Sequence, residues 1–358
     1  MRLKTWQKWF LGAGCGCSSL LIALTLLLYI PFVQEIISGL ASPQRPSDLP
    51  PVVTLPVSDA TENVPTSQED APDLPSSAPT QEKSVFPLNP FSELSDVELS
   101  PYPYITGVRQ HTREIFDRGQ QLGNRPNVFS KVGDSITVTG AFLTPFGRGN
   151  YTLGDYAYLQ PVIDFYNTET ARTSNSFQNE SLVTSNGWRA YSVLSPENAN
   201  PQVCQPGEIP LVCEYRLTRP AVALIMLGTN DVIPSLPHEY EQHMRAILDI
   251  SIEMGVIPIL STIPEYKQVN LHHEVAQLNE IIIALAREYD VPLWDYHLLL
   301  AGLSNQGIGE DGVHPSVSYA HPAEFTSNYL HLGMTVRNLS ALQVLDAIYW
   351  AIIHPSTE

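Results

Sequence analysis

Residues 221–231 read Ala-Val-Ala-Leu-Ile-Met-Leu-Gly-Thr-Asn-Asp, and this stretch decides the class of fold. Seven consecutive apolar residues that end at Gly228 are typical of a strand that is buried on both faces of a sheet. Three further stretches show a similar pattern and are expected to be strands: residues 127–132, 256–261 and, more weakly, 291–295.

Helical patterns separate these strands. They fall at residues 108–122, 240–254, 272–289 and 339–353. Apolar strands that alternate with amphipathic helices predict an α/β fold, in which a mainly parallel sheet is covered on both faces. Ligands of such sheets bind at the carboxyl ends of the strands, and both Gly133 and Gly228 directly follow an expected strand. Functional side chains are therefore expected at this edge of the sheet.

The first motif at this edge is Gly133-Asp134-Ser135. A glycine after a strand allows a sharp turn, and a helix that follows would place Ser135 at its N-terminus, beside free backbone N–H groups. The same tripeptide also occurs in ordinary turns and helix caps, so it does not identify a nucleophile alone.

The second motif is Asp311-Gly312-Val313-His314. A serine hydroxyl needs a base to remove its proton, and His314 is a side chain suited to that role. Asp311, three residues earlier, is placed to accept a hydrogen bond from the other ring nitrogen and to orient the imidazole. Taken alone, these residues fit a polar turn equally well.

The third motif is Gly228-Thr229-Asn230-Asp231. The amide of Asn230 is a candidate donor to a developing oxyanion, although Gly, Asn and Asp are also the residues that turns prefer. The joint occurrence of a nucleophile, a base with its acid and an amide donor favours a serine esterase.

With these three motifs the chain resembles the SGNH hydrolases, also called the GDSL esterase/lipase family. The resemblance rests on residues 133–136, 228–231 and 311–314, and covers the chain from about residue 127 to the C-terminus. Ile136 stands where the family name has Leu, an apolar exchange that leaves the chemistry intact. The order of the motifs differs from that of the α/β-hydrolases, which carry a Gly-x-Ser-x-Gly elbow.

The resemblance implies a three-layer α/β/α sandwich, similar to flavodoxin, over residues 101–358. It implies Ser135 as nucleophile, His314 as base and Asp311 as the residue that orients it. Asn230 and the backbone N–H of Ser135 would donate to the oxyanion. A further family block supplies a glycine N–H to the same hole, and Gly187 is the candidate here, before an expected short helix at residues 189–194.

The sequence of residues 1–33 predicts that the rest of the chain is exported from the cytoplasm. Residues 1–9 are basic and aromatic and form an expected short cytoplasmic N-terminus, and residues 10–33 are uncharged and apolar. Roughly 20 apolar residues span a bilayer, and positive charge ahead of them predicts a single-pass anchor with the remainder outside the cytoplasm. Cleavage as a signal peptide, which would give a secreted protein, is the alternative, because residues 39–41 read Gly-Leu-Ala.

Residues 34–100 are expected to be a disordered linker, since Pro, Ser, Thr, Asp and Glu dominate from residue 41 to about residue 90. In an oxidising compartment, Cys204 and Cys213 are expected to form a disulfide. The alternative of a zinc site would need further ligands nearby. We expect no metal site and no cofactor, and His272 and His273 are interpreted as surface residues.

The formal charge of −18 argues against nucleic acid as a partner. The expected substrate is a small-molecule or glycan ester, with O-acetyl esters of glycans as one class. Residues 142–181 carry several aromatic side chains, which suit either a rim over the cleft that binds sugars or ordinary core packing. The rival functions are acyl transfer to a glycan acceptor and a non-catalytic surface binding module. The sequence does not give the oligomeric state.

Overall fold

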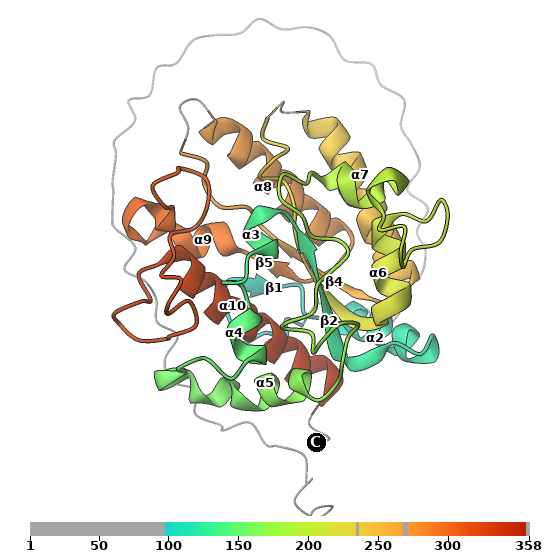
Figure 1. Cartoon of the computed structure of the whole chain (residues 1–358), viewed down its shortest axis with the longest axis horizontal. Helices are drawn as coiled ribbons and strands as arrows, with labels where there is room; N and C mark the ends of the chain where they lie inside the picture. The colour runs from blue at the N-terminus through green and yellow to red at the C-terminus, as the bar shows by residue number, and fades with distance from the viewer. Residues whose placement is uncertain (1–96, 234–235, 268–270, 356–358) are drawn as a thin grey trace, which may run out of the picture. The chain divides into compact units, whose positions relative to one another are not determined.

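The structure is a computed structural model that describes residues 97–233, 236–267 and 271–355. Its centre is a sheet with the strand order β1-β5-β4-β3-β2 (Figure 1). The strands are β1 (Ile105–Thr106), β2 (Arg125–Gly133), β3 (Pro220–Met226), β4 (Ile257–Ser261) and β5 (Leu293–Trp294).

Strands β2, β3, β4 and β5 pair in parallel, as their apolar patterns predicted. Residues of β3 and β4 are buried throughout, because helices cover both faces. The short edge strand β1, which was not predicted, pairs antiparallel with β5 and makes the sheet mixed. Two residues carry too little pattern to be recognised as a strand.

Helices lie on both sides of the sheet (Figure 1). On one side are α6 (Pro210–Thr218), α7 (Pro237–Glu253) and α8 (His272–Glu288). On the other side, α10 (Gly333–Ile348) packs with α5 (Gln160–Asn167), and the turn that continues α10 packs with α2 (Gln110–Gln121). The shorter helical segments are α3 (Ser135–Val138), α4 (Thr144–Gly147), α9 (Tyr296–Ala301), η1 (Gly154–Leu159), η2 (Ala190–Leu194), η3 (Pro196–Asn198) and η4 (Ser304–Gly307).

Helix α10 differs from its prediction at both ends. It begins at Gly333 rather than Leu339, and it continues into the π-helical turn η5 (Tyr349–Ile353). All residues of α10 are buried, including Arg337 and Asn338, which interrupt the apolar pattern near its start. A helix that is buried on all sides has no polar stripe, so periodicity alone does not locate its first turn.

Helix α2 approaches the turn before β4 closely. A Cβ atom on Gly119 would lie 2.1 Å from the carbonyl oxygen of Gly255, so the two backbones touch here. The Asn124 side chain donates hydrogen bonds to the carbonyl oxygens of Met254 and Gly255, at 2.9 Å each. This contact fixes α2 against the sheet.

Residues 10–33 and 34–96 lie outside the described part of the chain, so the expected anchor and most of the linker stay predictions. Over the ranges described, no helix combines the length and the apolar character that a membrane crossing requires.

The contact between Gly119 and Gly255 predicts that Gly119→Ala destabilises the domain. Overpacking costs about 1–3 kcal/mol, which exceeds the gain of about 1 kcal/mol that alanine brings to a helix. Chemical denaturation of the full chain measures the difference. Gly140→Ala is the control, because a Cβ there has no atom within 4 Å; equal losses in the two variants would contradict the packing argument.

Candidate active site

Strand β2 delivers Ser135 to the carboxyl edge of the sheet. A Cβ on Gly133 would lie 2.3 Å from Thr137 Oγ1 and 2.7 Å from the carbonyl oxygen of Met226, so the turn after the strand has room only for glycine. Asp134 caps the helix α3 by accepting a hydrogen bond from the Ile136 N–H at 2.9 Å. Ser135 is the first residue of that helix, and its own N–H has no acceptor among the described residues.

The structure brings Ser135, His314 and Asp311 together in one line of contacts. The Oγ of Ser135 lies 2.8 Å from Nε2 of His314, and Nδ1 of His314 lies 2.7 Å from Oδ2 of Asp311. Because an ionised Asp311 only accepts, Nδ1 carries the hydrogen and Nε2 is left to accept from the serine hydroxyl. This is the arrangement in which a histidine can take the proton of a serine.

Asp311 and His314, the expected acid and base, lie on one tight turn. Its ends are joined by an antiparallel bridge between Ile308 and Pro315, and Gly312 adopts a positive φ of 74° at its tip. The backbone N–H of Lys267, from the segment after β4, donates to the carbonyl oxygen of Gly312 at 2.8 Å. The turn is therefore fixed to the neighbouring strand, although the side chains of Asp311 and His314 are about half exposed.

The environment of Asp311 keeps it ionised. Partial burial acts to raise the pKa of this carboxyl. The backbone N–H groups of Val313 and His314, each 2.9 Å from Oδ1, and the hydrogen bond from the His314 ring outweigh that effect and hold the pKa below its usual value. An ionised carboxylate is what the orienting role requires.

The expected oxyanion donors lie near the same edge. The segment that holds Gly187 runs beside the end of β2, since Thr184 forms a parallel bridge with Gly133. Gly187 has a φ of 74°, and a Cβ there would meet no atom within 4 Å. The Asn230 amide donates to the carbonyl oxygen of Trp188 at 3.0 Å and lies 3.5 Å from Oδ2 of Asp134. The oxyanion roles of Ser135, Gly187 and Asn230 stay predictions.

Arg337 of α10, a residue that sequence reasoning missed, supports the turn that carries Ser135. Its guanidinium donates to the Ile136 carbonyl oxygen and, at 2.9 Å, to Thr137 Oγ1. It lies 3.7 Å from the centre of the Phe142 ring. Burial lowers the pKa of Arg337 to about 10, so it is still charged at neutral pH. The signal for it was a lone arginine in a mostly apolar C-terminal pattern.

An open cleft of about 710 Å³ contains Ser135 and His314. Its other lining residues come from the α3 turn and the segment after it, from Asn186, from the long loop between η4 and α10, and from Met334 in the first turn of α10. None of them belongs to residues 142–181, so that segment does not form the rim. Of the two interpretations of its aromatic side chains, core packing therefore holds. The side chains that are buried in the core or packed against it are Phe146, Tyr151, Tyr156, Tyr158, Phe165 and Tyr166.

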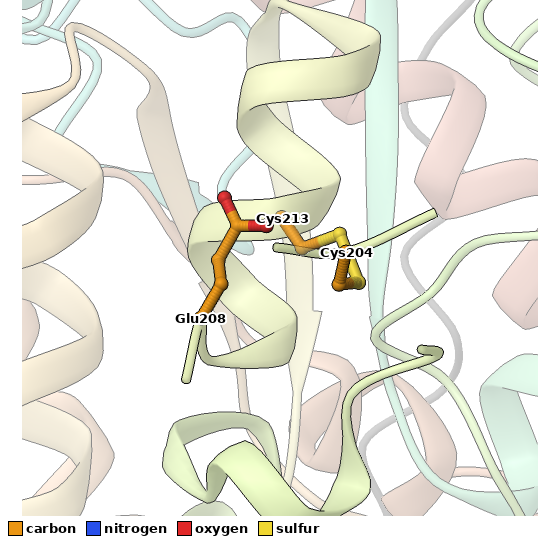
Figure 2. A group of neighbouring side chains, drawn as sticks. All are labelled: Cys204, Glu208 and Cys213. Carbon is orange, nitrogen blue, oxygen red and sulfur yellow. A yellow bond between two sulfur atoms is a disulfide. The ribbon is translucent and has the colours of Figure 1, made fainter. Parts of the chain in front are cut away.

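The predicted disulfide between Cys204 and Cys213 is formed, with a Cα–Cα distance of 5.4 Å (Figure 2). Glu208 lies beside it, a third possible metal ligand that sequence reasoning did not count. Its carboxylate is held by Arg216 at 2.7 Å, and these hydrogen bonds lower the pKa of Glu208. The sulfurs are bonded to each other, so this group is a structural staple and not a ligand set.

The two expected surface histidines begin helix α8. His272 is largely exposed and its Nδ1 lies 2.5 Å from Oε1 of Glu265. His273 is exposed as well.

The comparisons with known proteins agree with this geometry. A model of the GDSL-like Lipase/Acylhydrolase family matches residues 131–318, which is more than half of the chain and includes Ser135, Gly187, Asn230, Asp311 and His314. The chain belongs to this family. As a member of the GDSL-like lipase/acylhydrolases, it is a carboxylic ester hydrolase. No curated protein is similar enough to count as a match.

Solved structures of two esterases and of a lipolytic protein of the G-D-S-L family are distantly similar. A psychrotrophic esterase from Pseudoalteromonas sp. is 15% identical, with a TM-score of 0.39, over 62% of this chain and 97% of its own. An acetylxylan esterase from Geobacillus stearothermophilus is 17% identical, with a TM-score of 0.38, over 61% and 93%. A lipolytic G-D-S-L family protein from Veillonella parvula is 16% identical, with a TM-score of 0.37, over 60% and 96%.

Asp231, the last residue of the third motif, is a buried carboxyl at the same edge. It accepts from the Ala190 N–H at 3.2 Å through Oδ2. Burial raises its pKa to about 6, and the nearby charge of Asp134 acts in the same direction. The folded protein therefore holds this proton more tightly than the unfolded chain, in which an aspartate has a pKa of about 3.9.

The raised pKa of Asp231 gives a pH prediction. The folded state binds more protons, so the free energy of unfolding falls as the pH rises from about 4 to about 6 and stays lower above that. Asp231→Asn can still accept from Ala190 but cannot ionise, so its free energy of unfolding is expected to fall less over this pH range than that of the wild type. Urea unfolding at pH 4.5 and 7.5 compares the two proteins. The exposed Asp117→Asn serves as control, and parallel pH profiles for wild type and D231N would refute the idea.

Proposed function

We propose that this family member is a serine esterase that hydrolyses carboxylic esters through an acyl-enzyme on Ser135. The observation that carries the proposal is the unbroken line of contacts from Ser135 Oγ to His314 Nε2, at 2.8 Å, and from His314 Nδ1 to Asp311 Oδ2, at 2.7 Å. A binding module would have no need for this alignment.

The reaction follows from these contacts. Ser135 Oγ attacks the ester carbonyl carbon while its proton passes to His314 Nε2. The carbonyl electron pair moves onto oxygen, where the N–H of Ser135, the N–H of Gly187 and the Asn230 amide are proposed to donate. Collapse of this intermediate expels the alcohol, which takes the proton from His314. Water then attacks the acyl-enzyme by the same steps and releases the acid.

The Asn230 amide has two internal acceptors, and they differ in strength. Its contact with the Trp188 carbonyl, at 3.0 Å, is a normal hydrogen bond, whereas that with Asp134, at 3.5 Å, is at the limit of one. We infer that the first contact orients the amide. The weaker one is given up when an oxyanion forms.

The proposal includes esters of glycans, with O-acetyl esters as one class. A cleft of about 710 Å³ beside Ser135 is far larger than an acetyl group requires. The alcohol part of the ester would fill the rest of the space.

The proposal also places the catalytic domain outside the cytoplasm, tethered by residues 10–33 and held off the membrane by residues 34–100. Two facts support this location: the basic, aromatic residues 1–9 precede a long apolar run, and the domain carries the Cys204–Cys213 disulfide. Secretion after cleavage remains the alternative.

Ser135→Ala is expected to lower kcat for a short carboxylic ester by at least about a thousandfold, because it removes the nucleophile. Ester hydrolysis by the purified full chain, together with labelling by a fluorophosphonate, measures this. The control is Ser327→Ala, which changes an exposed serine of the η4–α10 loop. Turnover by S135A near the wild-type rate would sink the assignment. Absence of the label from the wild type would instead favour a binding module.

For the location, we expect the full chain to stay with the membrane fraction after alkaline carbonate washing, and an added protease to digest the domain in intact spheroplasts. A variant that lacks residues 1–33 is expected to be soluble and inaccessible to the protease. If the wild-type chain is instead released into the medium after cleavage near residue 41, the N-terminal segment is a signal peptide and not an anchor.

A further inference from the structure

Tyr319 is an unusual residue of the catalytic cleft. Its side chain is 79% exposed, more than any other large apolar side chain in the described ranges, yet it lines the same cleft as Ser135 and His314. No hydrogen bond or ring contact to Tyr319 occurs within the residues described. A free aromatic face beside a nucleophile is a surface on which a flat, partly apolar group can stack.

Two polar side chains from different segments line the same cleft as Tyr319. Glu310 precedes the acid of the catalytic turn, and Asn186 precedes Gly187; both are exposed and both line the cleft. Neither has a hydrogen-bond partner among the described residues. Glu310 offers a carboxylate that accepts hydrogen bonds, and Asn186 offers both a donor and an acceptor. The lining of the cleft also has an apolar part, which includes the buried side chains of Ile136 and Met334.

This combination discriminates between classes of ester. A long acyl chain that extended to Glu310 would cover the free carboxylate of that residue, which is costly to desolvate. An anionic sugar would face Glu310 and Asp311, in a chain whose formal charge is −18. A neutral sugar ring has an apolar face of C–H groups for Tyr319 and hydroxyls for Glu310 and Asn186, so it matches the cleft on both counts.

We infer that Tyr319 and Glu310 form a subsite for the sugar ring of an O-acylated neutral saccharide, with Tyr319 stacking on the ring and Glu310 accepting from its hydroxyls. This inference rests on the proposed esterase function of Ser135 and deepens it. The subsite selects the alcohol part of the ester, whereas Ser135 and His314 perform the same chemistry on any ester that reaches them.

The test compares four esters on the full chain: an O-acetylated methyl glucoside, the corresponding methyl glucuronide, ethyl acetate and ethyl octanoate. The readout is kcat/KM for acid release, expressed relative to ethyl acetate. The wild type is expected to prefer the glucoside. Tyr319→Ala should lower the ratio of glucoside to ethyl acetate about tenfold, a size typical of an aromatic contact, and Tyr319→Phe should restore it.

Glu310→Gln is expected to reduce the preference for the glucoside over the glucuronide. The substitution removes the repulsion between the Glu310 carboxylate and the carboxylate of the glucuronide, while the amide oxygen of Gln can still accept a hydrogen bond from a sugar hydroxyl. Leu298→Ala, which changes an exposed side chain of α9 outside the cleft, should leave every ratio as it is. An unchanged ratio in Y319A, or a wild-type preference for ethyl octanoate, would overturn the subsite. Lack of turnover of all four esters by the wild type would instead overturn the proposed function.

Discussion

The position of Ser135 depends on a buried cation, Arg337. The turn after β2 must leave the sheet at once, and a helix of only four residues cannot hold itself in place. Arg337 supplies the missing support from α10, because its guanidinium binds the Ile136 carbonyl oxygen and Thr137 Oγ1. The neighbouring Asn338 supports the segment that follows α3 in the same way. Its amide binds the backbone of Ala141 and Leu143, and the carbonyl oxygen of Pro322.

These contacts join the two walls of the cleft to one helix. The turn from residue 136 to residue 143 forms one wall, and the long loop between η4 and α10 forms the other. Since α10 is buried along its whole length, it is packed on all sides and gives both walls a well-ordered support. The carboxylate of Asp134, which caps the N-terminus of α3, attracts the buried charge of Arg337 electrostatically.

The parts of the site that follow from local pattern could be predicted from the sequence. Strands β2 and β3 were recognisable from their apolar runs, and motif order placed Ser135, Asn230, Asp311 and His314 at one edge. The helix support was not predictable, because the interaction of Arg337 with Ile136 joins residues 201 positions apart. Tyr319 was missed for a different reason: exposure in a loop has no periodic signature, and it stands out only once the cleft is known.

The two parts of the proposed catalytic triad are held in different ways. Ser135 is fixed by the sheet and by α10, whereas Asp311 and His314 share one turn whose backbone sets their mutual distance. The turn is tied to the strand layer by the backbone contact between Lys267 and Gly312. If the turn swings away, the acid and base move as a unit and only the gap to Ser135 widens. Heat or denaturant should therefore abolish activity while the sheet is still folded. Loss of activity would then report displacement of this one turn and not unfolding of the domain.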